Sequence, residues 1–299
     1  SFNFNTIQVF VESAAEAGER PRVSLDPETG YVRILNNAVT TARGTKRTIW
    51  VDRRVRDGNE TIVVGGQIPL GSKCAEFRRT VENPALYTVT VLQEMIERMG
   101  VEVRGRPRVG VASSAALEVA IHRSRPLALI VWGLNKWSNN FVAEQMLKTI
   151  GAERYGPPGT FDKGVAAIGE FLSSLGVPEG EYEIADGSGL SRLNRVSANA
   201  LVSVLVHAYQ DFAIFPEFVS SLAVMGVDGS ADDRLKGSAA EGRVRVKTGT
   251  LTGVSSLSGY AEGKDGEVFA FAILINDFPC GQHQVREIQD RIAMLLAGS

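Results

Sequence analysis

The chain has 299 residues, which is long enough for two domains or for one large domain with insertions. With 44% hydrophobic and 22% charged residues and a formal net charge of −2, it has the composition of an ordinary globular protein and offers no electrostatic attraction for a nucleic acid. No apolar run approaches the roughly 20 residues that a membrane-spanning helix needs. Cys74 and Cys280 stand far apart without neighbouring ligands, so the sequence predicts neither a metal site nor a cofactor. Two isolated buried thiols are favoured over a disulfide between them, which would require a location outside the cytosol.

The N-terminal part of the chain has the pattern of short β-strands. Runs rich in β-branched and aromatic residues fall at 9–11, 31–35, 48–51 and 61–64, and turn sequences such as Asp26-Pro27-Glu28-Thr29-Gly30 separate them. We therefore expect residues 1–122 to form one or more β-rich domains. Polar and apolar residues alternate over residues 1–10 as in a strand, without an initiator methionine, so we expect these domains to be incomplete at the N-terminus.

Helical periodicity begins at Asn83-Pro84 and ends at Gly100, and residues 101–111 return to short extended segments. Further on, helices are expected at 138–150, with Gly151 as C-cap, at 164–175, and at 197–209, with Ser197 as N-cap. Strands at 243–247, 254–261 and 268–275 precede a last helix at 283–296, whose apolar face we expect to comprise Val285, Ile288, Ile292 and Leu295. The sequence thus predicts an α+β fold in which residues 123–299 pack helices on an antiparallel sheet.

Segment 243–250, with the sequence RVRVKTGT, carries candidate binding residues at the end of a strand. Alternation places two valines on the core face and Lys247 on the other face. Gly249 allows a ligand backbone to approach the strand edge, whose free N–H and C=O groups pair with an extended peptide. A cation beside the hydroxyls of Thr248 and Thr250 suits the terminal carboxylate of a peptide. Taken alone, these residues also fit a solvated strand end followed by a turn.

Two further segments carry polar residues suited to a cleft. In segment 135–140, NKWSNN, Ser138 fits the N-cap of a helix, but a cap does not explain Asn140, which can point into a neighbouring cleft. Segment 186–192, DGSGLSR, is a compact loop, and both a structural and a functional role for Ser188 fit it. No strand–glycine-loop–helix unit surrounds this loop, so we exclude a nucleotide site.

Together and in this order, the three segments resemble the penicillin-recognising serine peptidases, in which S-x-x-K, S-x-N and K-T-G motifs converge on one cleft. The likeness is to the class C low-molecular-mass D-alanyl-D-alanine carboxypeptidases/endopeptidases, which share segments like 134–144, 186–192, 226–229 and 246–251. It covers most of residues 83–292, and residues 1–71 resemble the inserted domains of that family more loosely. The resemblance implies a penicillin-binding, transpeptidase-like domain that carries β-rich inserted domains, in a periplasmic or otherwise extracytoplasmic location.

The resemblance also implies the catalytic roles. Ser138 relays a proton between the catalytic lysine and the leaving amine, Asn140 holds the peptide amide of the substrate, and Lys247 supplies positive potential.

The remaining candidates are implied to bind substrate. Thr248 and Thr250 bind the terminal carboxylate, the N–H of Thr250 forms half of the oxyanion hole, and Gly249 and Ser188 line the cleft. The implied ligands are peptidoglycan stem peptides that end in D-Ala-D-Ala and, for the complete protein, β-lactam antibiotics. Neither a nucleic acid nor a cofactor is implied.

The nucleophile of such enzymes comes from a Ser-x-x-Lys turn, yet none of the eight lysines in this sequence follows a serine at that spacing. Thr160-Phe161-Asp162-Lys163 is a near match on the wrong side of the S-x-N segment. We therefore expect that the chain begins within the inserted region, after the nucleophile, and forms no acyl-enzyme by itself. A complementing N-terminal segment or chain would supply the serine, and without it we expect low stability or association through uncovered apolar surface.

The sequence is compatible with three functions. The first is a serine peptidase acting on peptidoglycan, seen without its nucleophile segment. The second is a non-catalytic peptidoglycan- or protein-binding module that retains the cleft. A β-lactamase of the same superfamily is less favoured, because the chain carries a large β-rich insertion and no dedicated deacylating glutamate. The sequence does not separate carboxypeptidase from endopeptidase activity.

Overall fold

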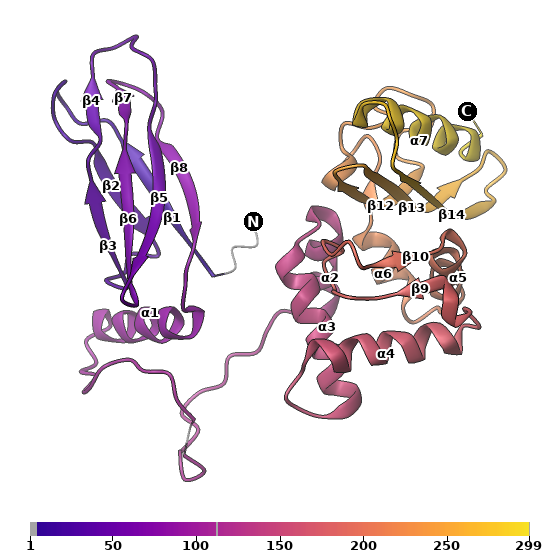
Figure 1. Cartoon of the computed structure of the whole chain (residues 1–299), viewed down its shortest axis with the longest axis horizontal. Helices are drawn as coiled ribbons and strands as arrows, with labels where there is room; N and C mark the ends of the chain where they lie inside the picture. The colour runs from indigo at the N-terminus through magenta and orange to yellow at the C-terminus, as the bar shows by residue number, and fades with distance from the viewer. Residues whose placement is uncertain (1–4, 112, 299) are drawn as a thin grey trace. The chain divides into compact units, whose positions relative to one another are not determined.

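The computed structural model describes residues 5–111 and 113–298. The chain forms two compact units, unit 1 up to Ile121 and unit 2 from His122 onward. The sequence-based boundary was placed between residues 122 and 123. Figure 1 shows the elements of both units.

Unit 1 is built from short strands in small sheets. One antiparallel sheet has the order β2-β1-β8, with β1 (Thr6–Glu12), β2 (Arg22–Asp26) and β8 (Ala75–Thr80). A second has the order β3-β6-β5, with β3 (Val32–Asn36), β5 (Trp50–Arg56) and β6 (Asn59–Gly65), and β4 (Val39–Thr41) pairs with β7 (Gln67–Pro69). Alternate residues of the two larger sheets meet in one core, which includes Ile7, Val9, Val51, Ile62 and Val64.

Helix α1 (Pro84–Arg98) lies across one end of these strands (Figure 1). The Asn83 side chain caps it by accepting a hydrogen bond from the backbone N–H of Leu86, and Tyr87 packs into the core of unit 1. The prediction of extended segments at 101–111 was wrong, since the described residues between α1 and residue 126 form no helix or strand. This stretch is rich in exposed residues, and therefore lacks the burial that stabilises a strand.

Unit 2 begins with helices. These are α2 (Leu127–Trp137), α3 (Asn140–Tyr155), α4 (Phe161–Ser174), α5 (Ala198–Gln210) and α6 (Phe215–Ser221). Ser197 caps α5 as predicted, whereas α3 continues past Gly151 to Tyr155. Gly151 is not a C-cap, because it is the point at which α3 touches α4: a Cβ there would collide with the backbone of Gly164.

The sheet of unit 2 is antiparallel, with the order β11-β12-β13-β14. Its strands are β11 (Ala223–Val224), β12 (Val244–Leu251), β13 (Val254–Glu262) and β14 (Val268–Asn276). Helix α7 (Gln282–Leu296) covers one face through Val246, Leu257 and Ala293, and α5 and α6 cover the other around Tyr260 (Figure 1). Two short strands, β9 (Tyr182–Glu183) and β10 (Arg195–Val196), pair beside α5. The predicted α+β fold class is therefore confirmed.

The predicted buried face of α7 was largely wrong. Val285 is buried, but Ile288, Ile292 and Leu295 are 50%, 37% and 73% exposed. The residues that face the sheet are instead Val285, Gln289 and Ala293. Among the described residues, no helix is both long and apolar enough to cross a membrane.

Candidate active site

Ser138 lies in the tight turn between α2 and α3. It ends α2 in the left-handed conformation, with φ 51° and ψ 54°, and its backbone N–H donates to the carbonyl of Leu134. Asn139, and not Ser138, is the N-cap of α3, because the Asn139 side chain accepts the hydrogen bond from the N–H of Val142 at 3.0 Å. A positive φ is costly for a residue other than glycine and is typical of functional turns. The Ser138 hydroxyl is thereby left free of a capping role.

Lys247 reaches this turn from strand β12. Its Nζ donates to the Ser138 hydroxyl at 2.7 Å and to the carbonyl of Thr248 at 2.8 Å. Burial lowers the pKa of Lys247 to about 8, because a desolvated ammonium loses its hydration. Lys247 is therefore not part of a solvated strand end. Helices cover both faces of the sheet. The face opposite the two valines, on which Lys247 lies, is therefore also covered and is not a solvent-exposed face.

Asn140 is the first residue of α3, two positions after Ser138, and is exposed. Within the described part of the chain, its side-chain amide has no hydrogen-bond partner. An unpaired amide beside the Ser138–Lys247 contact can both donate to and accept from a peptide bond.

Strand β12 leaves one edge partly open. It pairs with β13 along its whole length, but with β11 only at Arg245 and Val246. Beyond Val246, the second edge of β12 therefore has no strand partner among the described residues. Gly249 pairs with Ser256 of β13, and a Cβ at Gly249 would collide with the Ser256 hydroxyl. The edge of β12 that lies beyond Val246 and opposite β13 can accept an extended peptide as an additional strand.

A small cavity lies on the α7 side of this strand. The Thr248 hydroxyl is 2.8 Å from that of Ser230, and the guanidinium of Arg234 forms a 2.7 Å ion pair with Asp290. The lining residues are mostly hydrogen-bond donors: Ser230, Arg234, Thr248, Gly249, Thr250, Ser255, Ser256, Arg286 and Gln289. Hydroxyl and guanidinium donors in one cavity suit a carboxylate. Lys247 and the two threonines thus belong to opposite faces of one strand.

The loop at 186–192 is held against α3. The carboxylate of Glu144 accepts hydrogen bonds from the backbone N–H groups of Gly187 and Ser188, both at 3.1 Å. Gly187 must be glycine, because a Cβ would collide with the carbonyl of Ala143. The backbone N–H of Ser188 is therefore engaged, and its side chain is half-buried in the loop.

Asp186 organises the rest of this loop. Burial raises the pKa of Asp186, but hydrogen bonds from the Asn194 side chain and from the N–H groups of Ser191 and Gly189 outweigh that effect and hold it below its usual value. Arg192 donates to the carbonyl of Thr252 at 2.6 Å and so ties the loop to the tip of the β12–β13 hairpin.

Lys136 and Asp228 are a pair that sequence reasoning missed. The Lys136 ammonium lies 2.7 Å from both carboxylate oxygens of Asp228, and its side chain is only 3% exposed. Both residues lie in segments that carry the family resemblance, 134–144 and 226–229. Their contact joins positions 92 apart, and no local pattern predicts it.

The near match at Thr160 and Lys163 has a structural role. The Thr160 side chain caps α4 by accepting from the N–H of Lys163, and the Lys163 ammonium donates to the carbonyls of Gly156 and Pro158 at 2.7 and 3.0 Å. Neither residue is arranged as a nucleophile and its base.

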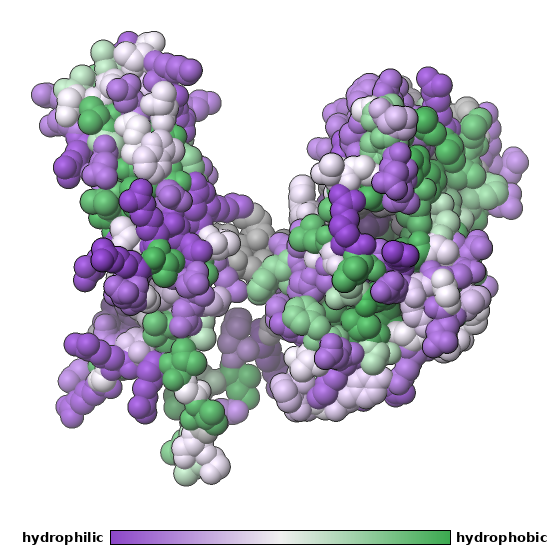
Figure 2. All heavy atoms as spheres, viewed as in Figure 1, coloured by the Kyte–Doolittle hydropathy of each residue, from purple (hydrophilic) through white to green (hydrophobic). Residues whose placement is uncertain are grey.

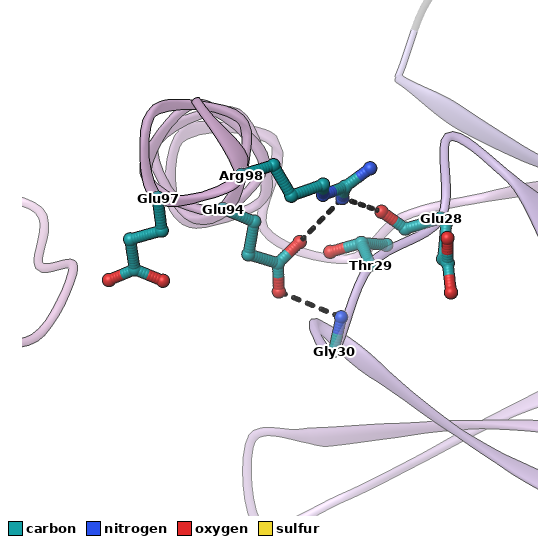
Figure 3. A pocket seen from close by; sticks show the side chains of 6 residues that line it. All are labelled: Glu28, Thr29, Gly30, Glu94, Glu97 and Arg98. Atoms are coloured by element: carbon teal, nitrogen blue, oxygen red, sulfur yellow. Dashed lines mark hydrogen bonds and ion pairs between the residues drawn. The ribbon is translucent and has the colours of Figure 1, made fainter. Parts of the chain in front are cut away.

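A second hollow lies in unit 1, between α1 and the β2–β3 connection (Figure 3). Glu94 accepts from the N–H of Gly30 at 2.8 Å, and Arg98 donates to the carbonyl of Glu28 at 2.6 Å. These hydrogen bonds connect α1 to the segment between β2 and β3, so the polar groups of the hollow have a structural role. Among the described residues of either unit, no group of three His, Cys, Asp or Glu side chains is arranged to hold a metal ion.

The fold of the chain is similar to that of a solved penicillin-binding protein. The structure of penicillin binding protein 4 (dacB) from Haemophilus influenzae, solved with a novel β-lactam, matches with a TM-score of 0.76 over 99% of this chain and 70% of that one, at 23% identity. This likeness concerns the fold.

The sequence assigns the family. The profile of the D-Ala-D-Ala carboxypeptidase 3 (S13) family matches residues 2–299, and the chain belongs to that family. A D-alanyl-D-alanine carboxypeptidase of Actinomadura sp. (strain R39) is 39% identical over 304 residues, which cover 99% of this chain and 55% of the relative. The D-alanyl-D-alanine carboxypeptidase DacB of Haemophilus influenzae is 29% identical over 203 residues, 67% of this chain and 42% of the relative. The chain thus spans about half the length of these relatives.

Proposed function

We propose that the chain contributes the S-x-N and K-T-G parts of a serine-type D-Ala-D-Ala carboxypeptidase/endopeptidase that acts on peptidoglycan stem peptides in the periplasm or another extracytoplasmic compartment. The observation that carries this proposal is the 2.7 Å contact between Lys247 and Ser138 beside the open edge of β12. It brings the two motifs together across two separate elements. Membership of the S13 family supports the same activity.

Each candidate residue has a task in this proposal. A stem peptide lies along β12 as an added strand, and the Asn140 amide holds its peptide bond. Thr248 and Thr250 receive its terminal carboxylate beside the donors of Arg234 and Arg286, and the N–H of Thr250 polarises the scissile carbonyl.

Proton transfer falls to Ser138 and Lys247 in the same proposal. Ser138 passes a proton between the base of the nucleophile and the leaving amine, and the Lys247 ammonium stabilises the developing negative charge. Its pKa of about 8 keeps most of the lysine population charged at neutral pH. Ser188 lines the cleft from the 186–192 loop.

A Ser-x-x-Lys segment completes the site, and we propose that unit 2 binds it through surface that is uncovered in this chain. β14 is an edge strand of the sheet, and α7 exposes Ile288, Ile292 and Leu295 at spacings that share one helix face. Figure 2 shows hydrophobic residues at the surface in the region where Figure 1 places α7 and β14. An added strand and helix would bury this surface and stabilise unit 2 by about 25 cal/mol per Å².

The test compares this chain with a version extended to include a Ser-x-x-Lys segment from an S13 relative. Each is incubated with a fluorescent penicillin, and the labelled protein is quantified after denaturation. We expect a stoichiometric, stable adduct with the extended protein and none with the chain alone. A stoichiometric adduct on the chain alone would show that a residue of this chain is the nucleophile and would refute the division of labour.

Release of D-alanine from a stem pentapeptide, measured against cleavage of a cross-linked dimer, then assigns carboxypeptidase or endopeptidase activity to the extended protein.

A second candidate function is a non-catalytic module that binds peptidoglycan or protein. Such a module would use the open edge of β12 and the exposed Asn140 amide as a binding surface. This second candidate function predicts that the chain alone binds stem peptides ending in D-Ala-D-Ala and that no extension restores hydrolysis.

A further inference from the structure

Lys136 is a buried cation whose hydrogen-bonding capacity is fully used. Its ammonium donates to the carbonyl of Leu222 at 2.6 Å and to the two carboxylate oxygens of Asp228 at 2.7 Å each. An ammonium has three donors and no acceptor, so none remains for a substrate. Lys136 therefore acts on its surroundings and has no direct part in the chemistry.

The two partners of Lys136 flank strand β11. Leu222 precedes Ala223, and Asp228 lies just beyond the strand, where its carboxylate also accepts from the N–H of Val224 at 2.8 Å. Ala223 pairs with Val246 of β12, the residue before Lys247. The hydrogen bonds of Lys136 thus fix the strand that pairs with Val246, which directly precedes Lys247 of the K-T-G motif.

Two neighbouring contacts fix the same junction. The Asn135 amide donates to the buried hydroxyl of Ser221 at 2.7 Å. Gly229 has φ +67°, and a Cβ there would lie 3.0 Å from both the carbonyl of Lys136 and the Cβ of Ala223. The end of α2 is therefore packed directly against segment 226–229.

These contacts link the residues around the site into a closed ring, which we call the circuit. The path runs from Ser138 back two residues to Lys136, across to Asp228 and β11, over the β11–β12 pairing to Lys247, and back to the Ser138 hydroxyl. We propose that Lys136 and Asp228 are positioning residues that set the register between the Ser138 turn and the K-T-G strand. The importance of this role for catalysis rests on the function proposed above, whereas the positioning itself does not.

The effect of Lys136 on the geometry of the site can be measured separately from its effect on the stability of the chain. Removing one partner of an ion pair is strongly destabilising when the remaining charge stays buried, and costs less when that charge reaches water. Lys136→Met removes the charge and keeps most of the side-chain volume. It leaves Asp228 able to reach water, since the Asp228 side chain is 41% exposed.

The direct test is the titration of Lys247 in the whole chain, labelled with ¹³C at the lysine Cε and followed by NMR. Only eight lysines contribute signals, and Lys247→Arg assigns the one of interest. In the wild-type chain we expect a midpoint near 8. In Lys136→Met and Asp228→Ala, a loosened contact admits water, and the midpoint should rise by at least about one unit toward the ordinary lysine value.

Asp228→Glu retains the carboxylate at a half-exposed position and should keep the wild-type midpoint. Leu172→Ala is the matched control, because Leu172 is a buried residue of the α4–α5 core and its truncation lowers the melting temperature without touching the circuit. A folded Lys136→Met chain whose Lys247 titrates like the wild type would overturn the proposal. So would a shift of equal size in Leu172→Ala.

A second readout uses the protein extended with a Ser-x-x-Lys segment. Its acylation by a fluorescent penicillin should slow at least about tenfold in Lys136→Met, and should stay at the wild-type rate in Asp228→Glu and Leu172→Ala. If the extended wild-type protein is not acylated at all, the proposed function fails, and the NMR titration still decides whether the pair positions Lys247. Equal acylation rates in the wild type and Lys136→Met would overturn the catalytic importance of the pair.

Discussion

The Lys247 ammonium lies 2.7 Å from the Ser138 hydroxyl, although the two residues are 109 positions apart in the sequence. Both partners are held at a cost. Ser138 adopts a left-handed backbone conformation, and Lys247 carries its charge in a desolvated environment. Such costs are concentrated at functional sites, where the surrounding structure maintains them.

The buried charge of Lys247 makes stability depend on pH. A lysine whose folded-state pKa is about 8, below the unfolded value near 10.5, binds fewer protons in the folded state between these two pH values. The contribution of Lys247 to the free energy of unfolding therefore rises from pH 8 to pH 10.5, by about 1–3 kcal/mol after allowance for the partial exposure of the side chain. Lys247→Met should remove this rise, as measured by urea unfolding at pH 7, 9 and 10.

The control is Lys236→Met, which removes an exposed lysine from the same unit and should leave the pH profile as in the wild type. At pH 7 we expect Lys247→Met to be at least as stable as the wild type, because it no longer buries a charge. A constant difference between Lys247→Met and the wild type from pH 7 to pH 10 would contradict the assigned pKa.

Local sequence rules predicted the strands and helices around the site, but placed Ser138 wrongly by one position. A serine before a helix fits an N-cap, and so does the asparagine that follows it. In the structure Asn139 takes the cap, which releases the Ser138 hydroxyl for Lys247. Capping propensity does not discriminate between two adjacent residues that both suit an N-cap. In the structure they differ in their partners, because the Ser138 hydroxyl accepts a hydrogen bond from Lys247.

Helix α7 shows a second limit of sequence reasoning. Counting apolar residues selected Ile288, Ile292 and Leu295, yet the helix contacts the sheet through Val285, Gln289 and Ala293. Ala293 is small enough for close approach, and the buried Gln289 amide donates to the Ser255 hydroxyl at 3.2 Å. A polar residue in a core is invisible to a hydrophobic pattern when its partner is 34 positions away. The same reasoning explains why the Lys136–Asp228 pair was missed.

The Glu144 carboxylate should hold the 186–192 loop in place. In Glu144→Ala the N–H groups of Gly187 and Ser188 lose their acceptor, which should cost about 1–3 kcal/mol of unfolding free energy. Amide hydrogen exchange within the loop should also accelerate. Glu153→Ala is the control on the same helix, since Glu153 is exposed and makes no hydrogen bond or ion pair in the described structure. Equal exchange in the two variants would show that the loop does not depend on Glu144.

Gly249 keeps β12 and β13 at their normal separation. Because a Cβ at this position would meet the Ser256 hydroxyl, Gly249→Ala should destabilise the chain by about 1–3 kcal/mol. Ser256→Ala removes that hydroxyl, so the double variant should recover most of the loss in a double-mutant cycle. Purely additive unfolding free energies would mean that Gly249 is required for some other reason.

The exposed stripe of α7 should make the isolated chain associate. Ile288 and Leu295 are 50% and 73% exposed on one helix face, and β14 presents an unpaired edge within the described structure. We expect sedimentation velocity to show concentration-dependent association, and Ile288→Lys with Leu295→Lys to reduce it. Leu117→Lys with Val119→Lys is the matched control, because these residues are 90% and 96% exposed in the segment without helix or strand. If the control pair reduces association as much as the α7 pair, the stripe is not the contact surface. If the chain is monomeric at all concentrations and melts at high temperature, no apolar surface on unit 2 requires a covering segment.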